Sequence, residues 1–189
     1  DHGDSHDHGD SHDHGDSHDH GDSHEKHDHV HGRHLPEILK ILEGSALSNR
    51  ARGWAKTAFW RLAEAEASVH GISPDQVHFH EVGAVDAIVD IAGACLAADL
   101  LGVEQVICGT IFLGAGTVKC AHGVMPVPAP AVARLLQNAP TQLGPQLGEL
   151  TTPTGAALLR GFDAQFAEAP AGCILASGYG AGTKDFPKR

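Results

Sequence analysis

Apolar residues at helical spacing predict two helices between residues 35 and 71. In the first helix the apolar pattern runs until Gly44, which marks its end. Ser48 is the expected N-cap of the second helix, and Gly71 is its expected stop. One face of this second helix carries Trp54, Ala58, Leu62, Ala65 and Val69. We therefore interpret residues 35–71 as a helical segment.

Residues 72–189 alternate short strand patterns with helical patterns. The stretch 77–82 resembles a strand, and the stretch 85–101 is apolar on nearly every side, so we expect a helix buried all round. The other expected elements are strands at 105–108, 117–120 and 173–177 and helices at 129–138 and 154–162. The fold class that follows is a single mixed α/β domain with short strands and several helices.

The first 34 residues repeat and are almost wholly polar. Residues 1–24 are four copies of Asp-His-Gly-Asp-Ser-His, and residues 25–34 continue this composition without the period. Val30 is the one aliphatic side chain here, so the segment cannot bury enough apolar surface to offset the entropy of ordering. We expect three parts: a disordered tail at 1–34, the helical segment at 35–71 and an α/β core domain at 72–189.

The tail holds 12 of the 16 histidines, and this predicts metal binding. Imidazole is the commonest metal ligand near neutral pH and suits nickel, copper and zinc. Aspartate at every third position of the repeat adds oxygen ligands. The alternative is a polar linker, or a repeat expansion without a role. The predicted tail ligands are His6, His8, His12, His14, His18, His20, His24, His27, His29 and His31.

The charge and the cysteines narrow the function classes. The net charge of −11 argues against a basic nucleic-acid-binding surface, and no apolar run approaches the ~20 residues of a membrane-spanning helix. The four cysteines form no C-x-x-C pair, which favours reduced intracellular thiols, most of them buried, over a disulfide framework. The chain opens at Asp1 without an initiator Met or a signal peptide, so we expect an upstream piece to be missing.

A cluster of imidazoles and carboxylates around Phe79 predicts a divalent cation site. On a strand, His78 and His80 point to the same face, while Asp86 and Asp90 share one face of the helix that follows. Glu81 lies between them, at the junction of strand and helix. Such groups suit a divalent cation. The alternative is structural: Asp86 caps the helix and Asp90 hydrogen-bonds to His80.

The segment Lys119-Cys120-Ala121-His122-Gly123 is a second candidate. His122 follows a predicted strand, where it could serve as a metal ligand or an acid–base group, and Cys120 could be a soft ligand. A loop histidine beside a buried thiol is the alternative, and the two interpretations stay open.

The start of the predicted helix at 154–162 is a candidate anion site. Hydroxyl groups of Thr151, Thr152 and Thr154 surround Pro153, and Gly155 follows. Backbone N–H groups at a helix start bind phosphate or carboxylate readily, which would suit a nucleotide. Simple N-capping by Thr151 or Thr152 is the equal alternative.

Several of these stretches together resemble one family. HFHEVGAVDAIVDI, KCAHGVMPVPAPAVARLL, GELTTPTGAALL and GYGAGTKD occur in this order and look like the LarC nickel insertion proteins. The stretch RLAEAEASVHG and the His-rich tract are also similar to that family. The resemblance covers essentially the whole chain.

The resemblance implies a cytoplasmic nickel chelatase. Its substrates would be Ni²⁺ and a pyridinium bis-thiocarboxylate mononucleotide, and its product the nickel-pincer cofactor of lactate racemase. CTP with Mn²⁺ or Mg²⁺ would be required, bound outside this chain. Family members carry a segment before the tract and a C-terminal domain after GYGAG, so we expect a partial chain that depends on lactate racemase or the missing domain as protein partner. A homo-oligomer is left open. The alternative function is non-enzymatic nickel or zinc storage or delivery through the tail.

Overall fold

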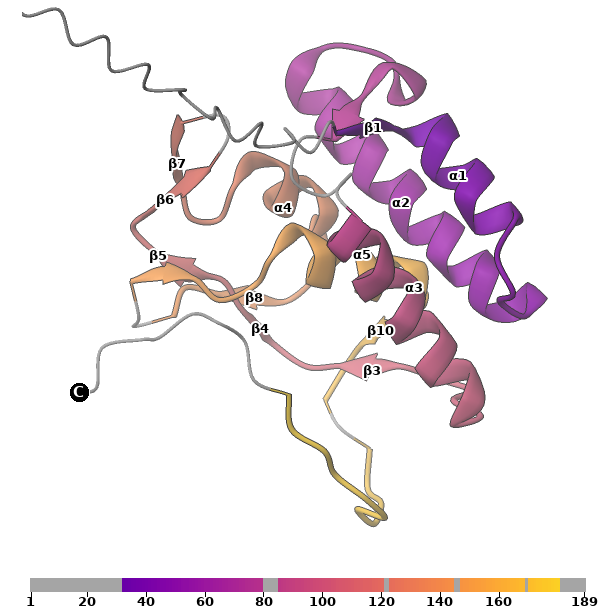
Figure 1. Ribbon diagram of the computed structural model, residues 1–189. Coiled ribbons are helices and arrows are strands. Elements are labelled where there is room, and N and C mark those ends of the chain that lie inside the picture. Colours follow the sequence, from indigo (N-terminus) through magenta and orange to yellow (C-terminus); the bar gives the residue numbers. More distant parts are fainter. Residues whose placement is uncertain (1–31, 80–84, 121–122, 145–146, 169, 181–189) are drawn as a thin grey trace, which may run out of the picture.

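The computed structural model describes residues 32–79, 85–120, 123–144, 147–168 and 170–180 (Figure 1). Its helices are α1 (Leu35–Glu43), α2 (Asn49–His70), α3 (Val85–Leu100), α4 (Pro130–Leu135), α5 (Pro153–Gly161) and the 3₁₀ turn η1 (Pro74–Gln76). Its strands are β1 (Arg33–His34), β2 (His78–Phe79), β3 (Ile107–Cys108), β4 (Ile111–Phe112), β5 (Gly114–Ala115), β6 (Thr117–Cys120), β7 (Gly123–Pro126), β8 (Thr141–Gln142), β9 (Gly148–Glu149) and β10 (Gln165–Phe166). The predicted mixed α/β class is therefore confirmed.

Helix α2 forms where its capping residues predict it. The Ser48 side chain is the N-cap and accepts a hydrogen bond from the backbone N–H of Ala51, 3.1 Å away. Gly71 ends the helix in the left-handed conformation with φ of 67°, which a residue without Cβ adopts at little cost. Both predicted ends of this helix are confirmed.

Helix α2 is also the centre of the packing. It contacts α1, α3, α4 and α5, and its fully buried side chains include Phe59 and Leu62. Helix α5 crosses it closely at Gly161, where a Cβ would lie 2.8 Å from both the Ala58 Cβ and the Trp54 carbonyl oxygen. Glycine at this position lets the two backbones approach each other.

The strands form five separate pairs rather than one sheet. Strands β1–β2, β5–β9 and β6–β7 pair antiparallel, while β3–β10 and β4–β8 pair parallel. Apart from β6 and β7, with four residues each, every described strand has two. Strands this short carry little pattern of their own, and this is why β4, β5, β7, β8, β9 and β10 were not predicted. Strand β1 was not predicted either, because residues 33 and 34 were counted in the disordered tail, whereas they pair with β2.

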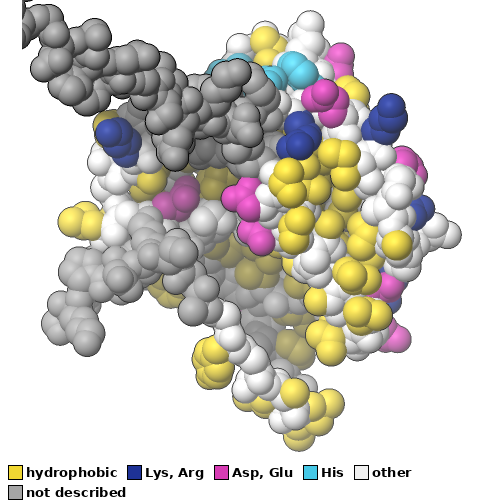
Figure 2. Space-filling model, viewed as in Figure 1, with side chains coloured by type: hydrophobic (Ala, Val, Ile, Leu, Met, Phe, Trp, Pro, Cys, Tyr) yellow, Lys and Arg dark blue, Asp and Glu magenta, His cyan; other side chains and the backbone are white. Residues whose placement is uncertain are grey.

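Helix α3 is half exposed, so the expectation of an all-round buried helix at 85–101 was wrong. Ile88, Ile91 and Cys95 are buried, but Val89 is 60% exposed and Leu100 is 78% exposed. Figure 2 shows hydrophobic side chains gathered over this helix on the face in view. The apolar residues on every side of this helix therefore do not show which side is covered in the fold.

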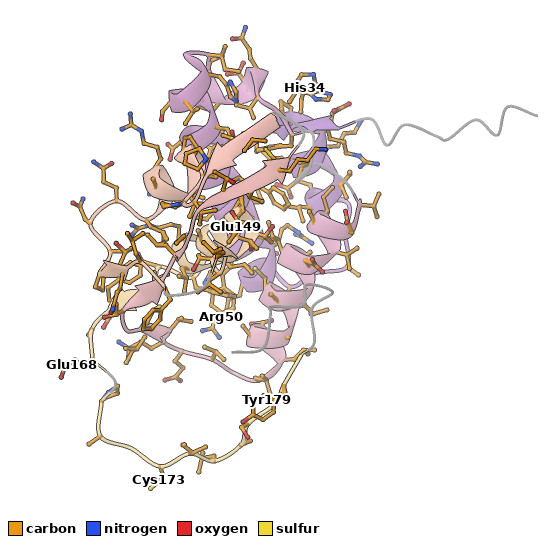
Figure 3. The ribbon with its side chains drawn as sticks, turned by 90° about the vertical axis from the view of Figure 1, so that its left-hand side faces the viewer. His34, Arg50, Glu149, Glu168, Cys173 and Tyr179 are labelled. Atoms are coloured by element: carbon orange, nitrogen blue, oxygen red, sulfur yellow. The ribbon has the colours of Figure 1, made fainter. Side chains whose placement is uncertain are left out.

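The predicted strand at 173–177 was also wrong, because this stretch has neither helix nor strand structure. Figure 3 shows Cys173 and Tyr179 on a segment that extends away from the rest of the molecule, at the end opposite to His34. Ile174 is 91% exposed, so its side chain has little contact with the described elements. Its apolar residues alone suggested a strand.

The cysteines are free, as expected, but most are not buried. Cys95 is buried, Cys108 and Cys120 are partly exposed, and Cys173 is exposed. The expectation that most thiols serve as buried apolar groups was therefore wrong. Among the described residues, no helix is both long enough and apolar enough to span a membrane.

Candidate functional site

A cavity of about 410 Å³ lies at one end of α2. Its walls come from the last turns of α2, from η1 and β2, from the β6–β7 hairpin and from the starts of α4 and α5. This volume falls in the range of about 300–1,000 Å³ that small-molecule sites occupy. The polar side chains in the wall belong to Glu66, His70, Gln76, His78, Lys119, Cys120 and Glu149.

The three histidines of the described residues all lie at this end of the molecule. His70 and His78 line the cavity, and the ring of His34 meets the ring of His78 with centroids 4.8 Å apart. His70 Nε2 is also 3.6 Å from the Glu66 carboxylate, one helical turn earlier. These imidazoles come from three elements: β1, the end of α2, and β2.

Strand pairing brings the end of the tail to the cavity. Strands β1 and β2 are antiparallel, with His34 opposite His78 and Arg33 opposite Phe79. Phe79 is buried and contacts Phe59 of α2 edge to face, with ring centroids 6.4 Å apart. The buried ring therefore fixes β2 against the core and leaves His78 on the cavity side.

The thiols differ in their fitness as ligands. Burial raises the pKa of the Cys95 thiol to about 11, which keeps it protonated near neutral pH. A metal needs a thiolate, so Cys95 is a packing group. Cys120 lines the cavity and is partly exposed, so of the two it is the thiol placed to meet a bound ion.

The structure places some of the predicted ligands and not others. His78 lines the cavity, while Asp86 and Asp90 are exposed on α3 and do not line it. The Asp86 carboxylate accepts a hydrogen bond from the N–H of Ala87, 2.9 Å away, at the start of the helix. His80, Glu81, His122 and the ten tail histidines lie outside the described residues. Within the described ranges, no three histidine, cysteine, aspartate or glutamate side chains converge to hold a metal ion.

The predicted anion site is a capped helix start beside the cavity. The Thr152 side chain is the N-cap of α5 and accepts from the Gly155 N–H, 3.2 Å away, while the Ala156 N–H donates to the Thr152 carbonyl. The Thr151 hydroxyl donates to the Phe112 carbonyl, 2.7 Å away. Pro153 lines the cavity and has no N–H to offer. The capping interpretation therefore accounts for Thr152 and Gly155, whereas Thr151 bonds to the Phe112 carbonyl and does not cap the helix.

A scan against protein families decides the family. The model described as "Nickel insertion protein" matches residues 7–189. The chain belongs to this family. The resemblance drawn from the sequence is thereby confirmed.

Relatives across bacteria carry matching names. A putative nickel insertion protein of Synechococcus elongatus is 48% identical over 161 residues, which cover 84% of this chain and 40% of the relative. A putative nickel insertion protein of Geotalea uraniireducens is also 48% identical, over 84% of this chain and 41% of its own length. A pyridinium-3,5-bisthiocarboxylic acid mononucleotide nickel insertion protein of Staphylococcus epidermidis is 44% identical, over 82% of this chain and 40% of its own length.

The chain thus spans about 40% of the length of the curated relatives it matches. No solved structure matches it significantly.

Sequence reasoning missed four polar residues of the cavity wall: Glu66, His70, Gln76 and Glu149. The signal for the first two was available, because a carboxylate and an imidazole four positions apart share one face of a helix. Glu149 stands just before the threonine cluster that was singled out. That these residues line the same cavity as His78 depends on how α2, β2 and β9 are arranged in the fold, which no local pattern reveals.

Proposed function

We propose that this chain is the metal-handling part of a nickel insertion protein. It captures Ni²⁺ and passes it to pyridinium-3,5-bisthiocarboxylic acid mononucleotide, which yields the nickel-pincer cofactor of lactate racemase. The observation that carries this proposal is that His70 and His78 line a cavity of about 410 Å³, with the ring of His34 beside that of His78 where the His-rich tract joins the domain. The family match and the name of the Staphylococcus epidermidis relative supply the substrate class.

The chemistry of the donor atoms gives the transfer its direction. Imidazole nitrogen binds Ni²⁺ but exchanges, whereas two thiocarboxylate sulfurs held on one ring bind it together. As each Ni–S bond forms, a Ni–N bond to the protein breaks and the sulfur loses any proton it carried. The oxidation state of nickel does not change. The cavity's part is to hold the ring so that its sulfurs face the imidazoles.

The wall of the cavity suits a mononucleotide as well as an ion. Lys119 brings an ammonium group that can pair with a phosphate. Val69, Ile72 and Met125 supply apolar surface for the flat pyridinium ring. The cationic ring lies favourably near the Glu66 and Glu149 carboxylates.

The CTP and the Mn²⁺ or Mg²⁺ expected from the resemblance do not fit the described residues. The N–H groups of Gly155 and Ala156 at the α5 start bond within the helix, so they are not offered to a triphosphate. The described ranges also contain no cluster of carboxylates for its cation. We propose that CTP and this cation bind elsewhere in the complete protein, and that lactate racemase or a further domain is the protein partner. Free thiols suit a cytoplasmic location.

The test is nickel transfer by the complete protein, which includes the part that binds CTP, supplied with Ni²⁺, the pyridinium mononucleotide, CTP and Mg²⁺. We expect nickel–sulfur absorption to develop, and His78→Ala to slow it by about tenfold or more, the scale that metal-site substitutions reach. Glu104→Ala, at an exposed side chain that does not line the cavity, is the matched control. Tight nickel binding without any transfer to the mononucleotide would favour the alternative function of storage or delivery.

A further inference from the structure

The pair of histidines where the tail meets the domain forms a preorganised contact. His34 and His78 stand directly opposite each other on β1 and β2, and their ring planes lie at 77° with centroids 4.8 Å apart. Opposite residues on paired strands project to the same face, within reach of one another. His34 is exposed, whereas His78 is partly buried and lines the cavity. The pair therefore extends from the solvent-exposed surface to the cavity wall.

The backbone on both sides of His34 is held in place. Its N–H donates to the Glu37 carboxylate, 2.8 Å away, and it is the N-cap of α1. Leu35, the next residue, is buried in the core. On the other side, Gly32 lies so close to β2 that a Cβ would come within 2.1 Å of the Phe79 carbonyl oxygen and 2.7 Å of the His78 ring. Glycine is thus required where the chain passes β2.

The separation of the rings matches that of two imidazoles sharing one ion. At a metal–nitrogen distance of about 2.1 Å, an ion lies roughly 3.2 Å from each ring centre. A centroid separation of 4.8 Å then corresponds to a nitrogen–metal–nitrogen angle between about 90° and 110°. Square-planar and tetrahedral ions both use angles in this range.

We propose that His34 and His78 form a two-imidazole transfer site for Ni²⁺, between the His-rich tail and the cavity. The tail is continuous with Gly32, so an ion bound there is tethered near the pair at an effective concentration on the order of millimolar. Ni–N bonds to tail imidazoles break as Ni–N bonds to His34 and His78 form, without a redox step. Two protein ligands and water hold the ion weakly, which suits transfer better than storage. The direction of transfer rests on the proposed function, whereas the two-imidazole site does not.

The first experiment measures the site with Ni²⁺ alone, in the full chain. Nickel broadens the NMR signals of nearby protons, so substoichiometric Ni²⁺ should broaden the ring signals of His34 and His78 together. His34→Gln should weaken the nickel effect at His78 by about tenfold or more. His78→Gln should likewise weaken the nickel effect at His34, because either variant leaves the ion with one imidazole of the pair. Glu104→Gln, at an exposed carboxylate that does not line the cavity, should leave both effects unchanged.

The second experiment keeps every histidine and changes only the pairing of β1 with β2. Gly32→Ala should separate β1 from β2 and reduce nickel broadening at His78, while total nickel bound by calorimetry stays within one equivalent of the unmodified chain. Gly172→Ala is the control, because a Cβ there meets no atom within 4 Å.

Two outcomes would overturn the proposal. One is full nickel broadening at His78 in folded His34→Gln, with folding checked by circular dichroism. The other is retention of that broadening in Gly32→Ala. A complete protein that shows the paired site but transfers no nickel to the mononucleotide would contradict the proposed function alone.

Discussion

Helices α2 and α3 show how differently two helices of one domain can relate to their sequences. Helix α2 carries charged residues along its length and contributes Ala51, Ala55, Phe59 and Leu62 to the core. Helix α3 has the more apolar sequence, yet Val85, Val89 and Leu100 are exposed. Although α2 is the less apolar helix, more of its residues are buried in the core.

The difference shows that position in the fold, more than composition, determines burial. Helix α2 has neighbours on four sides, because α1, α3, α4 and α5 all contact it. Helix α3 contacts α2 and α5, so only the side that carries Ile88, Ile91 and Cys95 is covered. Substitutions on the two helices should therefore have unequal effects even when the residues removed are similarly apolar.

The largest difference is expected between a core position of α2 and an outer position of α3. Phe59→Ala removes a fully buried ring and should lower the free energy of unfolding by about 3–5 kcal/mol. Val89→Ala, at a side chain 60% exposed, should change it by less than about 0.5 kcal/mol. Urea unfolding followed by circular dichroism measures both. Equal losses would mean that α3 is covered as fully as α2.

A smaller effect, of opposite sign at two sites, is expected for alanine in place of glycine. Gly161→Ala places a Cβ 2.8 Å from the Trp54 carbonyl, so α5 and α2 must move apart and about 1–3 kcal/mol should be lost. Gly53→Ala, where no atom lies within 4 Å, should gain about 0.5–1 kcal/mol through helix propensity. Thermal unfolding of the two variants measures both changes in stability. A gain in stability at both sites would contradict the close crossing of α5 and α2 at Gly161.

The contrast between these helices also explains what could be predicted from the sequence. The ends of α2 follow from Ser48 and Gly71, because caps act within a few residues. The exposure of α3 and the two-residue strands depend on residues distant along the chain. The same holds for the site: His78 was identified from its neighbours in sequence, but its contact with His34 depends on the pairing of β1 with β2, 44 positions apart. Likewise, no local pattern indicated that Glu66 and Glu149 line one cavity.

The smallest effect on stability is expected at the surface ion pair that joins α1 to α2. The pH dependence of stability shows whether this pair stabilises or destabilises the fold. Lys56 Nζ lies 2.5 Å from the Glu43 carboxylate, and this hydrogen bond and charge lower the pKa of Glu43 from its ordinary value of 4.5. A lowered carboxylate pKa stabilises the folded state above about pH 4.5, and that stabilisation is lost as the pH falls through the folded-state pKa. Glu43→Gln should therefore unfold at a slightly lower urea concentration than the unmodified chain at pH 7, with the difference shrinking below pH 4.5.

Glu104→Gln, at an exposed carboxylate, controls for the loss of one negative charge. A difference for Glu43→Gln that grows on acidification would contradict a stabilising pair, and α2 would then be joined to α1 by apolar contacts and by the hydrogen bond that Arg52 donates to the Leu42 carbonyl, 3.1 Å away.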